Sequence, residues 1–199
     1  KFRYTNLIKL FYKQQSYVEL LFFDHKHKFI NKIKIKPDEY SNEFLITRNI
    51  VGSNNFGVFY IFHKASENLE SIIRNSCYVG YSYNGNLYSF VHGNIYGKFS
   101  NIYSNEMIST DIVKTSLFQN HTYTIQKYFD DFDKNELFFT NPTSKTLKFS
   151  VDNKNYKLKP YFSLLIETKS PIIHIRSNCL FLRPTVFSYK GKFMDVHHS

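Results

Sequence analysis

Short apolar runs of strand length recur along this chain, and polar turn clusters separate them at intervals of about 8–12 residues. In one run Leu147, Phe149 and Val151 alternate with polar residues, which is the two-residue period of a strand with one buried face. Regularly spaced short strands are typical of antiparallel sandwiches and barrels. We therefore predict an all-β fold, an antiparallel β-sandwich of jelly-roll or immunoglobulin-like style.

The amino-acid composition agrees with a β fold. Aromatic residues make up 19% of the chain, whereas alanine, the best helix former, occurs only at Ala65. The frequent residues Phe, Tyr, Ile, Asn and Lys are also those that A/T-rich codons specify. Part of the bias is therefore expected to come from an A/T-rich genome.

The length of 199 residues allows one large β domain or two small ones. No linker rich in Pro, Gly or Ser divides the sequence. We therefore predict a single domain over residues 1–199, and a boundary near residues 116–121 is the alternative.

Residues 66–76 form the one segment with a clear helical pattern. Ser66 can cap the N-terminus, and Leu69, Ile72 and Ile73 recur at helical spacing. We predict one short helix here in an otherwise all-β chain.

The strongest local signal is Asn84-Gly85, the preferred pair for a two-residue type I′ hairpin turn. The alternation of strand faces on either side of that turn predicts that Cys77 lies directly opposite His92. A Cys–His pair can act as nucleophile and base or as ligands, and Asn94 follows in the next loop. We predict a binding site at these three residues; the alternative is a half-buried histidine beside a structural thiol.

The same hairpin register pairs Tyr81 with Tyr88. Exposed tyrosines on a sheet can bind proteins or stack on sugars, because the side chain combines a large area with a polar tip. We include both tyrosines among the predicted binding residues. The alternative is that they pack in the core as a cross-strand aromatic pair.

Two further groups of polar residues could carry chemistry. Asp195 and His197 point the same way on a strand, and together with His92 they would form a carboxylate–histidine site for a divalent metal. His174 and Arg176 share one strand face and could receive a carboxylate or sulfate, or could simply be solvated.

The formal net charge of +10 raises the question of an anionic partner. Five of the 26 basic residues are arginine, and the lysines are dispersed along the chain. Specific phosphate and base contacts favour arginine, so the charge alone does not indicate a nucleic-acid protein.

No pattern of nucleophile, base and orienting group is evident in the sequence, and no apolar stretch approaches the ~18 residues of a membrane-spanning helix. We predict a non-catalytic binding or structural module, an accessory domain or a subunit of a larger assembly, without a cofactor. It would bind a protein or carbohydrate surface through aromatic and basic sheet faces and loops. The alternatives are a metal-dependent jelly-roll enzyme and an RNA-associated basic subunit.

Overall fold

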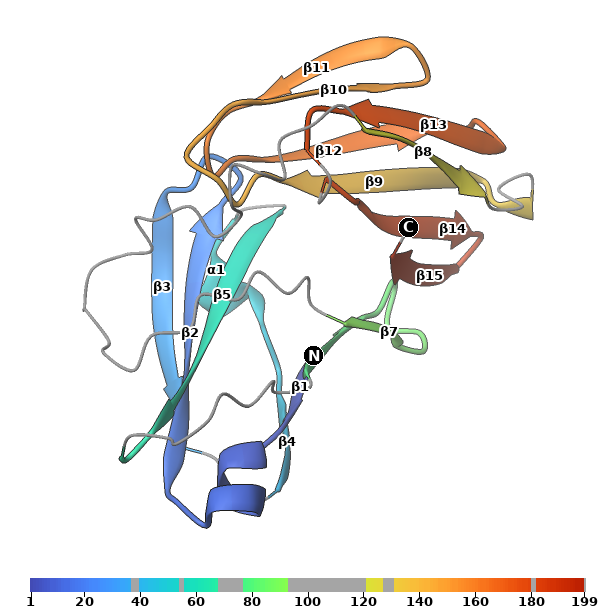
Figure 1. Cartoon of the computed structure of the whole chain (residues 1–199). Helices are drawn as coiled ribbons and strands as arrows, with labels where there is room; N and C mark the ends of the chain where they lie inside the picture. The colour runs from blue at the N-terminus through green and yellow to red at the C-terminus, as the bar shows by residue number, and fades with distance from the viewer. Residues whose placement is uncertain are drawn as a thin grey trace. The chain divides into compact units, whose positions relative to one another are not determined.

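The computed structural model describes residues 1–36, 40–53, 56–67, 77–92, 121–126, 131–179 and 182–198. The prediction of an all-β chain with antiparallel sheets is confirmed (Figure 1). The described helical segments are one turn each, the π-helix η1 (Ile8–Tyr12) and α1 (Arg48–Val51). The strands are β1 (Phe2–Thr5), β2 (Ser16–Asp24), β3 (Phe29–Ile35), β4 (Ser41–Phe44), β5 (Gly57–Ala65), β6 (Cys77–Tyr81), β7 (Ser89–His92), β8 (His121–Gln126), β9 (Lys134–Thr140), β10 (Leu147–Val151), β11 (Lys154–Leu158), β12 (Ser163–Thr168), β13 (Ile172–Ser177), β14 (Thr185–Lys190) and β15 (Phe193–His198).

The described strands form four small sheets, ordered β4-β1-β6-β7, β3-β2-β5, β11-β10-β13-β8 and β12-β9-β14-β15. The described part of the chain thus has four small sheets and not the two sheets of the predicted sandwich. The sandwich prediction is wrong because the described strands separate into sheets of three or four strands each and do not extend into two larger sheets. Strand β1, for example, pairs with both β4 and β6, which closes a separate small sheet.

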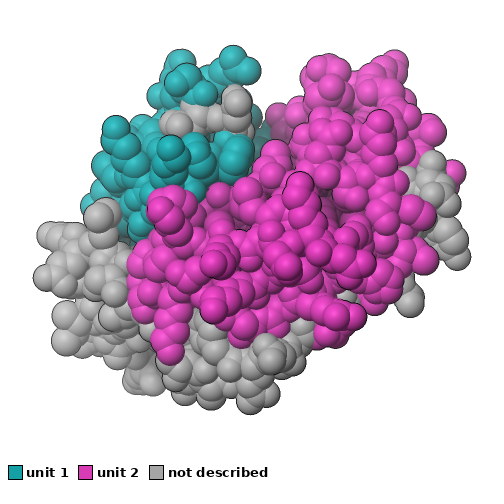
Figure 2. Space-filling view, turned by 90° about the horizontal axis from the view of Figure 1, so that it is seen from above, with its two compact units in different colours: residues 1–80, 92–107 teal, residues 81–91, 108–199 magenta. Residues whose placement is uncertain are grey.

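Contacts divide the chain into two compact units, residues 1–80 with 92–107 (unit 1) and residues 81–91 with 108–199 (unit 2) (Figure 2). In unit 1 the central strand is β2, which pairs with β3 on one side and β5 on the other. Phe59 contacts two other rings in this core. It packs edge-to-face against Phe2, with ring centroids 5.8 Å apart, and stacks on Phe22, with centroids 5.4 Å apart. Aromatic side chains thus supply much of the packing in unit 1.

One detail of unit 1 differs from the sequence pattern. The apolar run at residues 57–63 suggests a strand buried on both faces, yet β5 is only half-buried along its length. The strand buried on both faces is β2, whose residues 18–23 are all buried. The two strands differ in burial because β5 lies at the edge of its sheet, whereas β2 lies at the centre.

Unit 2 contains the sheets β11-β10-β13-β8 and β12-β9-β14-β15. Phe139 of one sheet and Phe149 of the other are in ring contact, with centroids 4.8 Å apart. The expected alternation along residues 147–151 is confirmed, since Leu147, Phe149 and Val151 are buried and the residues between them are not. Alternate residues of β9, β10, β13 and β14 therefore build a shared apolar core.

The buried side-chain amide of Asn141 forms several hydrogen bonds to turn backbone in unit 2. Asn141 is fully buried, and its Nδ2 donates to the carbonyl oxygens of Lys145 at 2.7 Å, Lys159 at 2.9 Å and Leu158 at 3.1 Å. Its Oδ1 accepts from the backbone N–H and the hydroxyl of Thr143. This side chain satisfies turn backbone that would otherwise be buried without partners.

Two sequence predictions fall largely outside the described residues. Of the helix predicted at residues 66–76, only residues 66 and 67 are described, and they form a bend. The alternative boundary near residues 116–121 also lies outside them, apart from the first residue of β8.

Candidate functional site

The predicted type I′ turn is confirmed. Asn84 and Gly85 have φ values of 51° and 72°, and the Asn86 N–H donates to the Tyr83 carbonyl at 3.1 Å. The residues that follow, 86–88, are not part of a strand. Regular pairing therefore does not continue outward from the turn, and the turn does not fix the register that we expected.

The predicted face-to-face pair of Cys77 and His92 is consequently wrong. Cys77 lies opposite Tyr4, on the buried side of β1 and β6. His92 is exposed and its ring packs edge-on against exposed Tyr78, with centroids 5.3 Å apart. Because Tyr78 and Cys77 are consecutive strand residues, they point to opposite faces, so His92 lies on the face away from the thiol. Asn94 lies outside the described residues.

The two tyrosines of the predicted site have different surroundings, both in unit 2. Tyr81 packs edge-to-face against Phe187 at 5.0 Å, and desolvation raises its pKa to about 12. This agrees with the packing alternative for Tyr81. Tyr88 is 37% exposed and lies beside Phe90, so its ring remains partly accessible to a partner.

Asp195 and His197 lie close together, as the sequence predicts. The distance from His197 Nδ1 to Asp195 Oδ2 is 3.6 Å, and Asp195 Oδ1 accepts a hydrogen bond from Ser89 Oγ at 3.1 Å. His92 belongs to the other unit. Within the described residues no group of three or more His, Cys, Asp or Glu side chains is placed to hold a metal ion. The metal site of His92, Asp195 and His197 therefore gains no support.

The arrangement with the clearest chemical consequence is the outer face of the β11-β10-β13-β8 sheet. The predicted alternation in β13 is confirmed, because Ile173 and Ile175 are fully buried while His174 and Arg176 are exposed. Cross-strand register brings further residues onto the same outer face. We call this set the basic face; it comprises Thr122, Thr124, Lys148, Ser150, Asn155, Lys157, His174 and Arg176.

Three cations of the basic face are neighbours. Lys148 lies directly opposite Lys157, and Ser150 lies opposite Arg176, which places the arginine diagonally across from Lys148. Directly opposed Cβ atoms are roughly 4.5–5.5 Å apart and diagonal neighbours roughly 7–8 Å. All three side chains are exposed, and within the described part of the chain none of them forms an ion pair.

Polar side chains frame these cations, and the carboxylate of Asp152 lies at the border of the basic face, opposite His174. His174 Nδ1 lies 3.1 Å from Thr124 Oγ1, which orients the imidazole along the sheet. Asp152, in the turn between β10 and β11, accepts from the His174 backbone N–H at 2.9 Å. The face therefore presents ammonium, guanidinium, hydroxyl and imidazole groups on a rigid sheet, a donor set suited to oxyanions.

Sequence reasoning identified only part of this face. The strand periodicity pointed to Lys148 as an outward residue and to the shared face of His174 and Arg176. Lys148 lies opposite Lys157 in the hairpin of β10 and β11, but the proximity of Arg176 to these lysines depends on the pairing of β10 with β13, which are not consecutive strands. No local pattern encodes that register.

Comparison with family models, with curated proteins and with solved structures gives no match. Among the described segments, none of the helices has the length and apolar character needed to cross a membrane.

Proposed function

We propose that this chain is a non-catalytic binding module that holds an anionic partner on the basic face. The observation that supports the proposal is the register that makes neighbours of Lys148, Lys157 and Arg176, none of which forms an ion pair among the described residues. Like charges directly opposite each other on a sheet are unfavourable. An oxyanion bound over them removes this repulsion and adds charge-assisted hydrogen bonds.

The composition of the basic face favours a particular class of anion. Single-stranded nucleic acid is bound largely by stacking of bases on aromatic side chains, and no aromatic residue belongs to this face. Tyr156 of β11 faces inward instead and stacks on Phe149 at 5.4 Å. The face therefore suits an anionic carbohydrate, whose sulfate and carboxylate groups need donors and charge without stacking.

The test is binding of a size-defined heparin oligosaccharide, a sulfated carbohydrate probe, measured by isothermal titration calorimetry. We expect salt-dependent binding that weakens roughly tenfold or more between 50 and 200 mM NaCl. A variant with Lys148→Gln, Lys157→Gln and Arg176→Gln should lose at least about tenfold in affinity, which corresponds to about 1.4 kcal/mol.

The matched control carries Lys36→Gln, Arg48→Gln and Lys169→Gln. These are also two lysines and one arginine, all exposed, and their replacement changes the net charge equally. The control should bind within about twofold of the wild type. An equal loss in both variants would show attraction to overall charge and refute the basic face as the site. Tighter binding of a single-stranded RNA probe, lost in the same triple variant, would favour the RNA-associated alternative.

A further inference from the structure

A row of four polar residues crosses the β12-β9-β14-β15 sheet from one edge to the other. Thr168 pairs with Asn135, Asn135 with Ser188, and Ser188 with Asp195, so the four side chains lie on one face. The neighbouring row on that face is mainly apolar, with Ile166, Leu137, Val186 and His197 in register. Phe139, further along β9, lies on the same face and contacts Phe149 of the other sheet in unit 2.

The two central members of the polar row are buried and unpartnered. Asn135 is 1% exposed and Ser188 is fully buried. Among the described residues, neither Nδ2 nor Oδ1 of Asn135 has a hydrogen-bond partner, and neither does Ser188 Oγ. The outer members do have partners, because Thr168 Oγ1 accepts from the Ser170 N–H and Asp195 Oδ1 accepts from Ser89 Oγ.

Buried polar groups in folded proteins are nearly always satisfied, and the neighbouring Leu137 and Val186 offer no polar side-chain atoms. The Asn135 amide supplies two N–H donors and an acceptor, and the Ser188 hydroxyl supplies one donor and accepts as well. A water molecule with two donors and two acceptors complements both groups at once. The serine side chain is also smaller than the leucine, valine and phenylalanine side chains of neighbouring positions on this face, which favours space for a small molecule beside Ser188.

We propose that Asn135 and Ser188 bind an ordered internal water molecule on the inner face of the β12-β9-β14-β15 sheet. The polar row also gives this water a route of exchange, since Ser188 lies directly opposite Asp195 on β15, whose side chain is 51% exposed. The site is independent of the basic face, because it lies on a different sheet and uses neutral groups.

The first measurement uses the intact wild-type chain. Water-selective NMR should show cross-relaxation between the Asn135 side-chain amide and a long-lived water, and none for exposed Asn155. A high-resolution crystal structure should show one water within hydrogen-bond distance of both Asn135 and Ser188. A dry site, or density for a larger molecule, would overturn the proposal.

The second measurement is a double-mutant cycle in thermal unfolding with Asn135→Leu and Ser188→Ala. Each single change leaves the other buried polar group and the water without one hydrogen-bond partner. The Tm loss of the double variant should therefore be smaller than the sum of the single losses. Asn155 and Ser150 supply the control, because they form the same cross-strand Asn–Ser pair on an exposed face. Their Asn155→Leu and Ser150→Ala changes should add. Additive losses in both pairs would also refute the proposal. If a variant does not fold, the NMR measurement on the wild type alone tests the proposal.

Discussion

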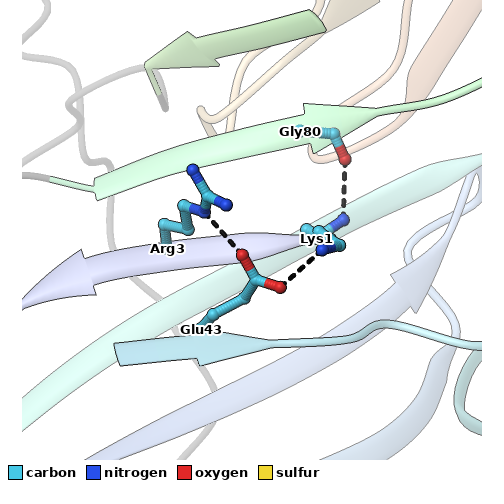
Figure 3. Close-up of polar contacts among 4 residues, drawn as sticks. All are labelled: Lys1, Arg3, Glu43 and Gly80. Carbon is cyan, nitrogen blue, oxygen red and sulfur yellow. Dashed lines mark hydrogen bonds and ion pairs between the residues drawn. The ribbon is translucent and has the colours of Figure 1, made fainter. Parts of the chain in front are cut away.

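Two glutamates in unit 1 each lie between two cations, and they differ in burial. The Glu19 side chain is 6% exposed, with Lys64 Nζ 2.7 Å and Lys32 Nζ 3.1 Å from its carboxylate oxygens. The Glu43 side chain is 36% exposed and contacts Lys1 Nζ at 2.7 Å and Arg3 Nε at 2.6 Å (Figure 3). Hydrogen bonds from Lys1 and Arg3 lower the pKa of Glu43.

We predict that Glu19→Gln lowers the free energy of unfolding by roughly 3 kcal/mol, because it leaves the ammonium of Lys64, only 13% exposed, without its counterion. Glu43→Gln should have a much smaller effect, because solvent already screens its ion pairs. Urea unfolding of the two variants gives both values. Equal losses would contradict the role assigned to burial.

The partly buried side chain of His27 should make the stability of the fold depend on pH. Its ring stacks on Phe23 with centroids 4.4 Å apart, and burial lowers its pKa although Asp24 opposes the shift. The unfolded chain therefore binds this proton at a higher pH than the folded chain does. Stability contributed by neutral His27 is present above the unfolded pKa of about 6.5 and is lost as the pH falls below it.

The expected result is a decrease in the free energy of unfolding from pH 7 to pH 5 that is smaller in a His27→Gln variant. Asp24, whose pKa is lowered by backbone hydrogen bonds from Lys28 and Lys26 against the effect of burial, responds only at more acidic pH. NMR titration of the His27 ring reports its pKa directly. A value at or above 6.5 would refute the prediction.

At the level of elements, the hairpin turn at Asn84-Gly85 allows the effect of backbone conformation on stability to be measured separately from side-chain packing. Gly85 has φ +72°, and a Cβ built there meets nothing within 4 Å. Gly85→Ala should therefore destabilise by about 1 kcal/mol through left-handed strain alone. Asn84→Gly, at φ 51°, should change stability far less, because both residues tolerate that conformation. Thermal unfolding of the two variants separates these cases, and equal effects would argue against strain as the cause.

The elements also show what the sequence can predict. Strand content and the alternation in residues 147–151 follow from local periodicity, and the turn at Asn84-Gly85 follows from residue preference. The assignment of strands to sheets does not follow from local sequence. Strand β9, for example, pairs with β12 and β14, and only long-range packing selects those partners. The same limit applies to the basic face, where β13 indicated Arg176 but not its neighbours. The predicted Cys77–His92 pair failed because residues 86–88 leave the strand, so the register assumed from the turn does not reach them.

At the scale of the whole molecule, the dominant property is a formal net charge of +10. Such a charge destabilises a compact state through self-repulsion. The screening length falls from about 30 Å at 0.01 M to about 8 Å at 0.15 M ionic strength, so salt should relieve much of the repulsion. Exposed cations that form no ion pair within the described residues, such as Lys36, Arg48 and Lys169, contribute to this repulsion.

We therefore predict that Tm rises when NaCl increases from about 10 to about 150 mM. A variant with Lys36→Glu, Arg48→Glu and Lys169→Glu has a net charge of +4, since each change replaces a positive by a negative charge. Its Tm should exceed that of the wild type at low salt and depend less on salt, because less repulsion remains to be screened. Differential scanning calorimetry at the two salt concentrations measures both effects. If the wild type and the variant gain the same Tm on addition of salt, net charge is not what limits the stability of this chain.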